Sequence, residues 1–131
     1  MKAVDTNVLI RFLVGDEQEM MQKVCDLFEQ AQERRERLLI TTPVLLEVFW
    51  VLQTSYDFGR ADILDAVETL AALPALEFER NFLPENLVEC GRGTNLDLAD
   101  ILIGLSARAQ GCETTLSFDK RALKSNLFEP V

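Results

Sequence analysis

Apolar residues recur at spacings of three and four along much of the chain, which is the period of amphipathic helices. This pattern predicts helices over 7–14, 16–36, 44–55, from Gly59 to just before Pro74, 84–90, 97–110 and 120–124. Short apolar runs between them predict strands over 2–5, 38–41, 75–78 and 113–118, with an extended stretch to Val131. Alternation of strands and helices predicts a parallel sheet covered by helices, an α/β sandwich.

Capping residues set the expected helix boundaries. Gly15 and Gly111 stop two of the helices, and Asp16 is expected to cap the helix over 16–36. Thr42 offers an N-cap hydroxyl before Pro43 at the first helical position. The stretch 91–93 is expected to be a loop.

The chain's length fits one domain, and we expect a single domain over 1–131. No apolar run approaches the roughly 20 residues of a membrane span, and the first residues lack the pattern of a secretory signal. We therefore expect a cytoplasmic protein without a membrane partner. The three cysteines are scattered, without metal-ligand spacing, and are expected to be reduced thiols that mostly pack in the core.

The chain contains no histidine. This excludes catalysis by a Ser-His-Asp triad, by a Cys-His pair or by paired histidines. Proton transfer must then rest on carboxylates, lysines, cysteines or metal-bound water. The 22 acidic and 13 basic residues give a formal charge of −9, which by itself argues against nucleic acid as a partner.

Two acids come directly after predicted strands, Asp5 after the first and Asp119 after a later one. In open parallel sheets, ligands bind at the carboxyl ends of strands, so both are candidate ligand residues. Each has a structural alternative, because aspartate at a strand-to-helix junction commonly caps the helix. Thr6 and Asn7 could take the capping role instead, which would leave Asp5 free.

Glu47 is the only charged residue of the apolar run 44–52. A helix this apolar should be buried on most sides, where an unpaired carboxylate costs several kcal/mol. The alternatives are a position on a narrow solvent-facing stripe or a pair with an arginine.

Asp100 lies in a helix whose main core stripe is expected to be Leu98, Ile101, Leu102, Leu105 and Ala109. On its own side of that helix, the only charged neighbour is Asp97, three residues earlier. Two acids one turn apart repel unless a positive charge lies near them. Asp97 has a structural alternative as the N-cap of the helix.

Asp5 and Asp119 thus lie at predicted strand ends, and Glu47 and Asp100 lie in apolar helices. Such a set suits a hard divalent cation, because Mg²⁺ and Mn²⁺ prefer oxygen ligands and keep several waters. Without a metal, a carboxylate cluster would raise its own pKa values and weaken the fold. The residues alone therefore predict a metal site.

Four segments are similar to the PIN-domain nucleases, in particular to the VapC-like toxins of bacterial toxin–antitoxin pairs. They are Asp-Thr-Asn-Val-Leu-Ile at 5–10, Leu-Glu-Val at 46–48, Leu-Ala-Asp-Ile-Leu-Ile-Gly at 98–104 and Ser-Phe-Asp at 117–119. The resemblance covers essentially the whole chain in order.

The resemblance implies a three-layer α/β/α sandwich with a central, mostly parallel sheet. It also implies an acidic pocket that binds Mg²⁺ or Mn²⁺, and endonucleolytic cleavage of RNA. By position it carries over the catalytic and metal-binding acids Asp5, Glu47, Asp100 and Asp119. It implies secondary roles for Asp97, Thr6, Asn7 and Ser117. It also implies a homodimer and a cognate antitoxin that lays a peptide into the site.

The charge of −9 then has an explanation, because two divalent ions would offset four negative charges locally. Arg11, Lys120 and Arg121 lie near the predicted site in sequence and are candidate phosphate contacts. Alternatively, these three side chains are ordinary charged residues on solvent-exposed helix surfaces. The acidic surface also suits a basic, arginine-bearing antitoxin segment.

Other α/β families with acidic pockets fit less well. A receiver-like phospho-acceptor domain needs paired acids at the first strand, but Asp5 follows Val4, and Lys120 adjoins Asp119 directly. A haloacid-dehalogenase-like phosphatase needs a second acid two residues after Asp5, where this chain has Asn7. A non-catalytic PIN-like binding module remains the main alternative.

Overall fold

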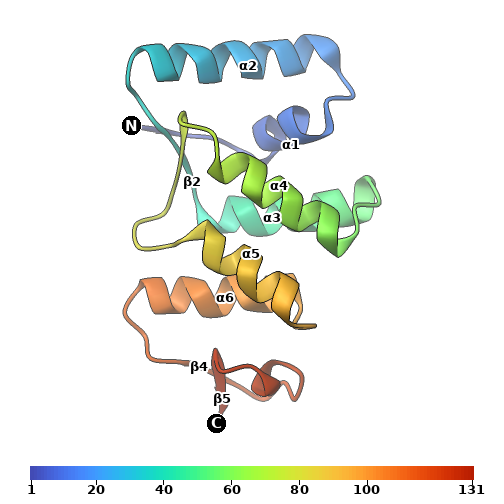
Figure 1. Cartoon of the computed structure of the whole chain (residues 1–131), viewed down its shortest axis with the longest axis vertical. Helices are drawn as coiled ribbons and strands as arrows, with labels where there is room; N and C mark the ends of the chain where they lie inside the picture. The colour runs from blue at the N-terminus through green and yellow to red at the C-terminus, as the bar shows by residue number, and fades with distance from the viewer. The chain divides into compact units, whose positions relative to one another are not determined.

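The computed structural model describes residues 1–131, which form two compact units, Met1–Glu79 and Arg80–Val131. Each unit contains its own strands and helices and is described separately (Figure 1). No helix is both long and apolar enough to cross a membrane. The expectation of one domain over 1–131 stays a prediction.

The first unit places helices in each connection between three parallel strands. The elements are β1 (Lys2–Ala3), α1 (Thr6–Val14), α2 (Gln18–Glu33), β2 (Leu38–Ile40), α3 (Thr42–Ser55), α4 (Arg60–Ala71) and β3 (Leu76–Phe78). The sheet order is β1-β2-β3, with Lys2 opposite Leu38 and Leu38 opposite Leu76. All three strands therefore end at the same edge of the sheet.

The core of this unit comes from the predicted apolar stripes. Helix α1 packs against α2 and α3 through fully buried side chains such as Leu9 and Leu52. Gly15 ends α1 in the left-handed region at φ 67°, as its sequence position predicts. On α2 the stripe is only partly buried, because Met20 and Leu27 of the expected set are exposed.

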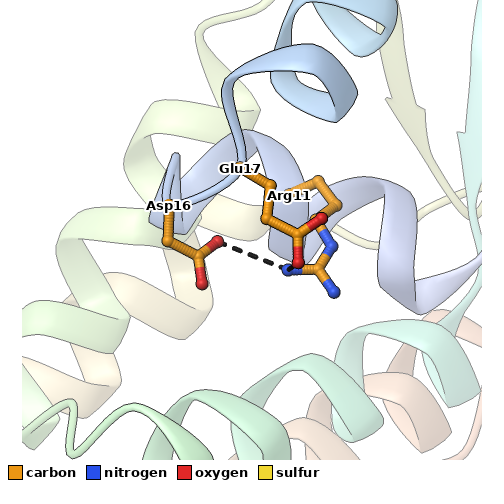
Figure 2. Close-up of polar contacts among 3 residues, drawn as sticks. All are labelled: Arg11, Asp16 and Glu17. Atoms are coloured by element: carbon orange, nitrogen blue, oxygen red, sulfur yellow. Dashed lines mark hydrogen bonds and ion pairs between the residues drawn. The ribbon is translucent and has the colours of Figure 1, made fainter.

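Two capping predictions were wrong. Helix α2 begins at Gln18, and Asp16 is not its cap. Asp16 and Glu17 instead each place a carboxylate oxygen 3.3 Å from Nη1 of Arg11 (Figure 2). Helix α3 begins at Thr42, one residue before the predicted proline start, so that Thr41 is the N-cap and makes no side-chain capping bond.

The second unit pairs two helices and closes with two parallel strands. Its elements are α5 (Pro84–Gly93), α6 (Leu98–Ala109), β4 (Thr115–Ser117), the 3₁₀ turn η1 (Ala122–Lys124) and β5 (Phe128–Pro130). Helices α5 and α6 pack side by side (Figure 1). The predicted loop over 91–93 was wrong, because α5 continues through Gly93 and buries Gly91.

Helix α6 passes close to the segment before β5. A Cβ atom on Gly104 would lie 2.9 Å from Cβ of Leu127, so glycine permits this packing. Leu98, Ile101 and Leu102 of the predicted core stripe are buried. Parallel strands and covering helices confirm the α/β class, with the strands in a three-stranded and a two-stranded sheet.

The three cysteines are free thiols, as expected. Cys25 and Cys90 are half-buried, which is compatible with packing. Cys112 is exposed, so the expectation of core packing was wrong there.

Candidate functional site

Asp5 lies just past β1, at the edge of the sheet where the parallel strands end. It is the N-cap residue of α1, and its Oδ1 accepts a hydrogen bond of 2.7 Å from the backbone N–H of Thr6. The expectation that Thr6 or Asn7 would do the capping was therefore wrong. The capping bond occupies one carboxylate oxygen and orients the group, while Oδ2 accepts no hydrogen bond from the protein.

Thr6 is 5% exposed, and its hydroxyl has no hydrogen-bond partner. A buried, unsatisfied hydroxyl costs about 1–3 kcal/mol, so such a group is rare without a function or a bound water. It follows Asp5 directly. Asn7, the next residue, is exposed and makes no side-chain hydrogen bond.

Glu47 does not lie where the apolar run predicted. It is exposed, and it forms no ion pair with an arginine. Helix α3 buries Leu45, Val48, Phe49 and Leu52 but leaves a stripe of exposed residues on the opposite side. Glu47 shares that stripe with Leu46 and with Trp50, which is 64% exposed. The solvent-facing alternative therefore holds, and Glu47 bears no burial cost.

Asp100 is the electrostatically perturbed acid of the chain. It lies in the first turn of α6 and is partly buried, and it accepts no hydrogen bond from the protein. Burial, and then the negative charges of Asp97 and Asp119, raise the pKa of the Asp100 carboxyl above its usual range. The second unit thus brings together three of the predicted acids.

Asp97 also has the structural role that was its alternative. It is the N-cap of α6, and its Oδ1 accepts from the backbone N–H of Ala99 at 3.0 Å. Asp97 therefore has two effects: it caps α6, and its negative charge raises the pKa of Asp100.

Asp119 follows β4 and is exposed. Its Oδ1 accepts from the N–H of Arg121 at 2.9 Å, and its own N–H donates to Oγ of Ser117 at 2.9 Å. Asp119 therefore caps the turn that leads into η1, which was its structural alternative. As in Asp5, one carboxylate oxygen is fixed by a backbone amide and the other has no partner in the protein.

The three candidate phosphate contacts differ. Arg11 faces the carboxylates of Asp16 and Glu17, an arrangement that favours the structural alternative for this residue (Figure 2). Lys120 and Arg121 are exposed on the turn after Asp119, and neither forms an ion pair. Their side chains are free to bind an anion.

The donor chemistry around Asp100 fits a hard divalent cation. The group is made of carboxylates, none of which pairs with a lysine or arginine, and their mutual repulsion would be relieved by positive charge. No three acidic or cysteine side chains converge closely enough to form a complete protein cage for a metal. Mg²⁺ commonly uses one or two protein carboxylates and fills its other positions with water and substrate phosphate.

Glu79 is an acid at a strand end that the sequence reasoning missed. It follows β3, and its two carboxylate oxygens accept from the N–H of Thr42 at 2.9 Å and from the Thr42 hydroxyl at 2.8 Å. The rule that selected Asp5 and Asp119, an acid directly after a strand, applies equally to Glu79. This carboxylate caps α3 from another element, which explains why Thr41 makes no capping bond.

We expect Glu79→Ala to lower the free energy of unfolding by about 2 kcal/mol, since it removes two charge-assisted bonds from a helix N-terminus. Urea unfolding at pH 7 measures this change. Glu77→Ala, two residues earlier in β3, is the matched control, because Glu77 has no such contact, and it should change stability little. Equal losses in both variants would contradict the capping role.

A cleft of about 440 Å³ lies in the second unit, away from the predicted acids. Its lining comes from the start of α5 and the end of α6, namely Asn81, Phe82, Leu83, Asn86, Leu105, Arg108, Ala109, Gln110 and Gly111. None of the predicted site residues lines it. The candidate site is therefore defined by its carboxylates and not by an enclosed pocket.

Comparison with known proteins agrees with the resemblance. The family model described as PIN domain matches residues 2–126 and so spans both units. A protein of Aquifex aeolicus (strain VF5) named VapC ribonuclease is 32% identical over 127 residues, which cover 95% of this chain and 91% of that protein. No solved structure matches the chain. The chain therefore belongs to the PIN-domain family and is a relative of the VapC ribonucleases.

Proposed function

We propose that this chain is a metal-dependent endoribonuclease and the toxin component of a toxin–antitoxin pair. The observation that carries the proposal is the uncompensated group of carboxylates around Asp100, which the fold holds together despite its repulsion. Perturbed acids that lack a structural partner are typical of catalytic sites. The VapC ribonuclease relative supports RNA as the substrate.

Asp5, Glu47, Asp100 and Asp119 are the proposed metal ligands, with Mg²⁺ or Mn²⁺ as the ion. A bound divalent ion would supply a Lewis acid for the scissile phosphate and lower the pKa of the attacking water.

The chain's own groups prepare this site in three ways. The amides of Thr6 and Arg121 fix one oxygen of Asp5 and of Asp119, so that each presents its second oxygen in a defined orientation. The unpartnered Thr6 hydroxyl is available to orient a water beside Asp5. The same burial and negative neighbours that raise the pKa of Asp100 favour binding of a cation to its carboxylate. Asn7 and Ser117 are proposed as supporting residues.

The partners proposed are RNA, a cognate antitoxin and a second copy of the chain. The formal charge of −9 is complementary to a basic antitoxin segment, and such a segment could contact acids outside the site. The exposed Leu46 and Trp50 on α3 offer apolar surface in the first unit that an antitoxin or a second copy would cover. We propose a cytoplasmic location, where the RNA substrate is found.

The proposal is tested by incubating the purified full chain with transfer, ribosomal and messenger RNA. Cleavage is expected with Mg²⁺ or Mn²⁺ and should cease when EDTA removes the metal, because no histidine is present to support metal-free cleavage. Gel analysis of end-labelled RNA measures the products and identifies the RNA class that is cut.

Two results would count against this function. Cleavage that persists in EDTA would exclude the metal-dependent mechanism. Absence of cleavage in all RNAs, combined with intact RNA binding, would favour the alternative of a non-catalytic PIN-like binding module.

A further inference from the structure

Two large apolar side chains stand exposed just before Asp119, Leu116 in β4 and Phe118 directly after it. Leu116 is 61% exposed and Phe118 is 84% exposed, while Thr115 and Ser117 are half-buried. This alternation of exposure places Leu116 and Phe118 on the same side of the extended segment 115–118. Phe118 makes no ring contact with another aromatic residue of the chain. We call Leu116 and Phe118 the β4 platform.

The backbone that carries Phe118 is held by hydrogen bonds on both sides. The N–H of Asp119 donates to Oγ of Ser117 at 2.9 Å, and the N–H of Leu123 donates to the Asp119 carbonyl at 3.0 Å. The ring therefore extends from a turn whose backbone is already ordered, so ligand binding costs little further backbone freedom.

Positive charge follows Phe118 and Asp119 in the sequence. The stretch 117–125 contains Lys120, Arg121 and Lys124 against the single acid Asp119, a net charge of +2 in a chain whose total is −9. The one acid that faces the platform from β5 is Glu129, which is the register partner of Leu116 and lies toward the opposite end from Lys120. The Phe118 end of the platform therefore suits a negatively charged ligand.

We infer that the β4 platform is a base-stacking site that holds single-stranded RNA, with Phe118 under a base and Lys120 and Arg121 on the flanking phosphates. An aromatic face beside cationic side chains is the combination that binds single strands without sequence preference. Bases inside an A-form duplex are stacked on one another and closed to a protruding ring, so the platform selects unpaired RNA. Phe118 is thus a positioning residue that places a nucleotide next to Asp119. The inference rests on the proposed ribonuclease function.

The test measures RNA binding apart from cleavage. In the full chain carrying Asp100→Asn, fluorescence anisotropy follows a labelled single-stranded RNA of about 12 nucleotides, within the site sizes of known single-strand binders. Phe118→Leu, which keeps apolar surface but removes the π face, should weaken binding about tenfold. Phe118→Trp should bind as tightly as the parent. Met20→Ala, an exposed apolar residue of α2, is the control and should have no effect.

Salt dependence separates the ring from the charges. Lys120→Gln and Arg121→Gln should each reduce the slope of log affinity against log salt by about 0.7, the value for one phosphate of a single strand. Phe118→Leu should change affinity at every salt concentration without changing this slope.

Three results would overturn the inference. The first is equal RNA affinity in Phe118→Leu and the parent. The second is equal affinity of the parent for the single-stranded RNA and for the same RNA annealed to its complement. The third is no RNA binding at all. Unchanged RNA affinity together with loss of self-association in Phe118→Leu would instead assign the platform to contact with a second copy. Failure of the wild type to cleave RNA, with these binding effects intact, would overturn the proposed function alone.

Discussion

Asp100→Asn should reduce RNA cleavage by at least about 100-fold, beyond the 10–100-fold typical of residues that only support a metal ligand. Asparagine has the same shape but lacks the charge that would bind a divalent ion. Asp100 accepts no hydrogen bond from the protein, so the fold loses nothing by the change. Initial rates of cleavage of end-labelled RNA measure the loss, and circular dichroism verifies the fold.

Asp97→Asn is the matched control, since it makes the same chemical change one helical turn earlier. Asparagine caps helices as well as aspartate does, so its bond to the Ala99 amide should persist. Its effect on cleavage should be far smaller than that of Asp100→Asn. Equal rates in Asp100→Asn and the wild type would contradict the assignment of Asp100 as a ligand.

The same variant has a second expected effect on the metal-free protein. The folded-state pKa of Asp100 is raised, so its ionised form destabilises the fold at pH values above that pKa. This penalty decreases as the pH falls through the folded-state pKa and is absent below the pKa of the unfolded chain. In EDTA, Asp100→Asn should therefore be more stable than the wild type at pH 7. The two should converge in acid, as measured by urea unfolding at each pH.

The helices were the part of the fold that the sequence predicted best. Gly15 and Gly111 adopt positive φ just past α1 and α6, a conformation that glycine tolerates without strain, so the predicted ends hold. Errors at helix starts arose where another residue takes the acid or supplies the cap. Asp16 pairs with Arg11, five residues earlier, across the turn at Gly15. The N-terminus of α3 is capped by Glu79, 37 residues away, a contact that no local pattern contains.

The candidate site was predictable to a similar degree. Asp100 and Asp97 lie one turn apart in the sequence, so their repulsion could be expected, but the contribution of Asp119 depends on the fold. Glu47 was misplaced because an apolar run was taken as evidence of burial on most sides. Leu46 and Trp50 are exposed beside it, and an exposed apolar stripe has the same sequence pattern as a buried one.

Asp5 provides the second large effect, because its structural and catalytic roles can be separated. Asp5→Asn keeps an oxygen that can accept from the Thr6 amide, so the cap on α1 should survive. Asp5→Ala removes both the cap and the charge and should lower the free energy of unfolding by about 1 kcal/mol. Both variants should lose cleavage by at least about 100-fold. An active Asp5→Asn would reduce Asp5 to a helix cap.

Combining Asp5→Asn with Asp100→Asn tests whether the two carboxylates act on the same step of RNA cleavage. Asp5 belongs to the first unit and Asp100 to the second. Residues that act on the same reacting group are strongly non-additive, because removing either one already abolishes the shared function. The double variant should therefore cleave RNA no more slowly than either single variant. If the two losses multiply instead, the carboxylates act independently, and the assignment of both to one metal ion is excluded.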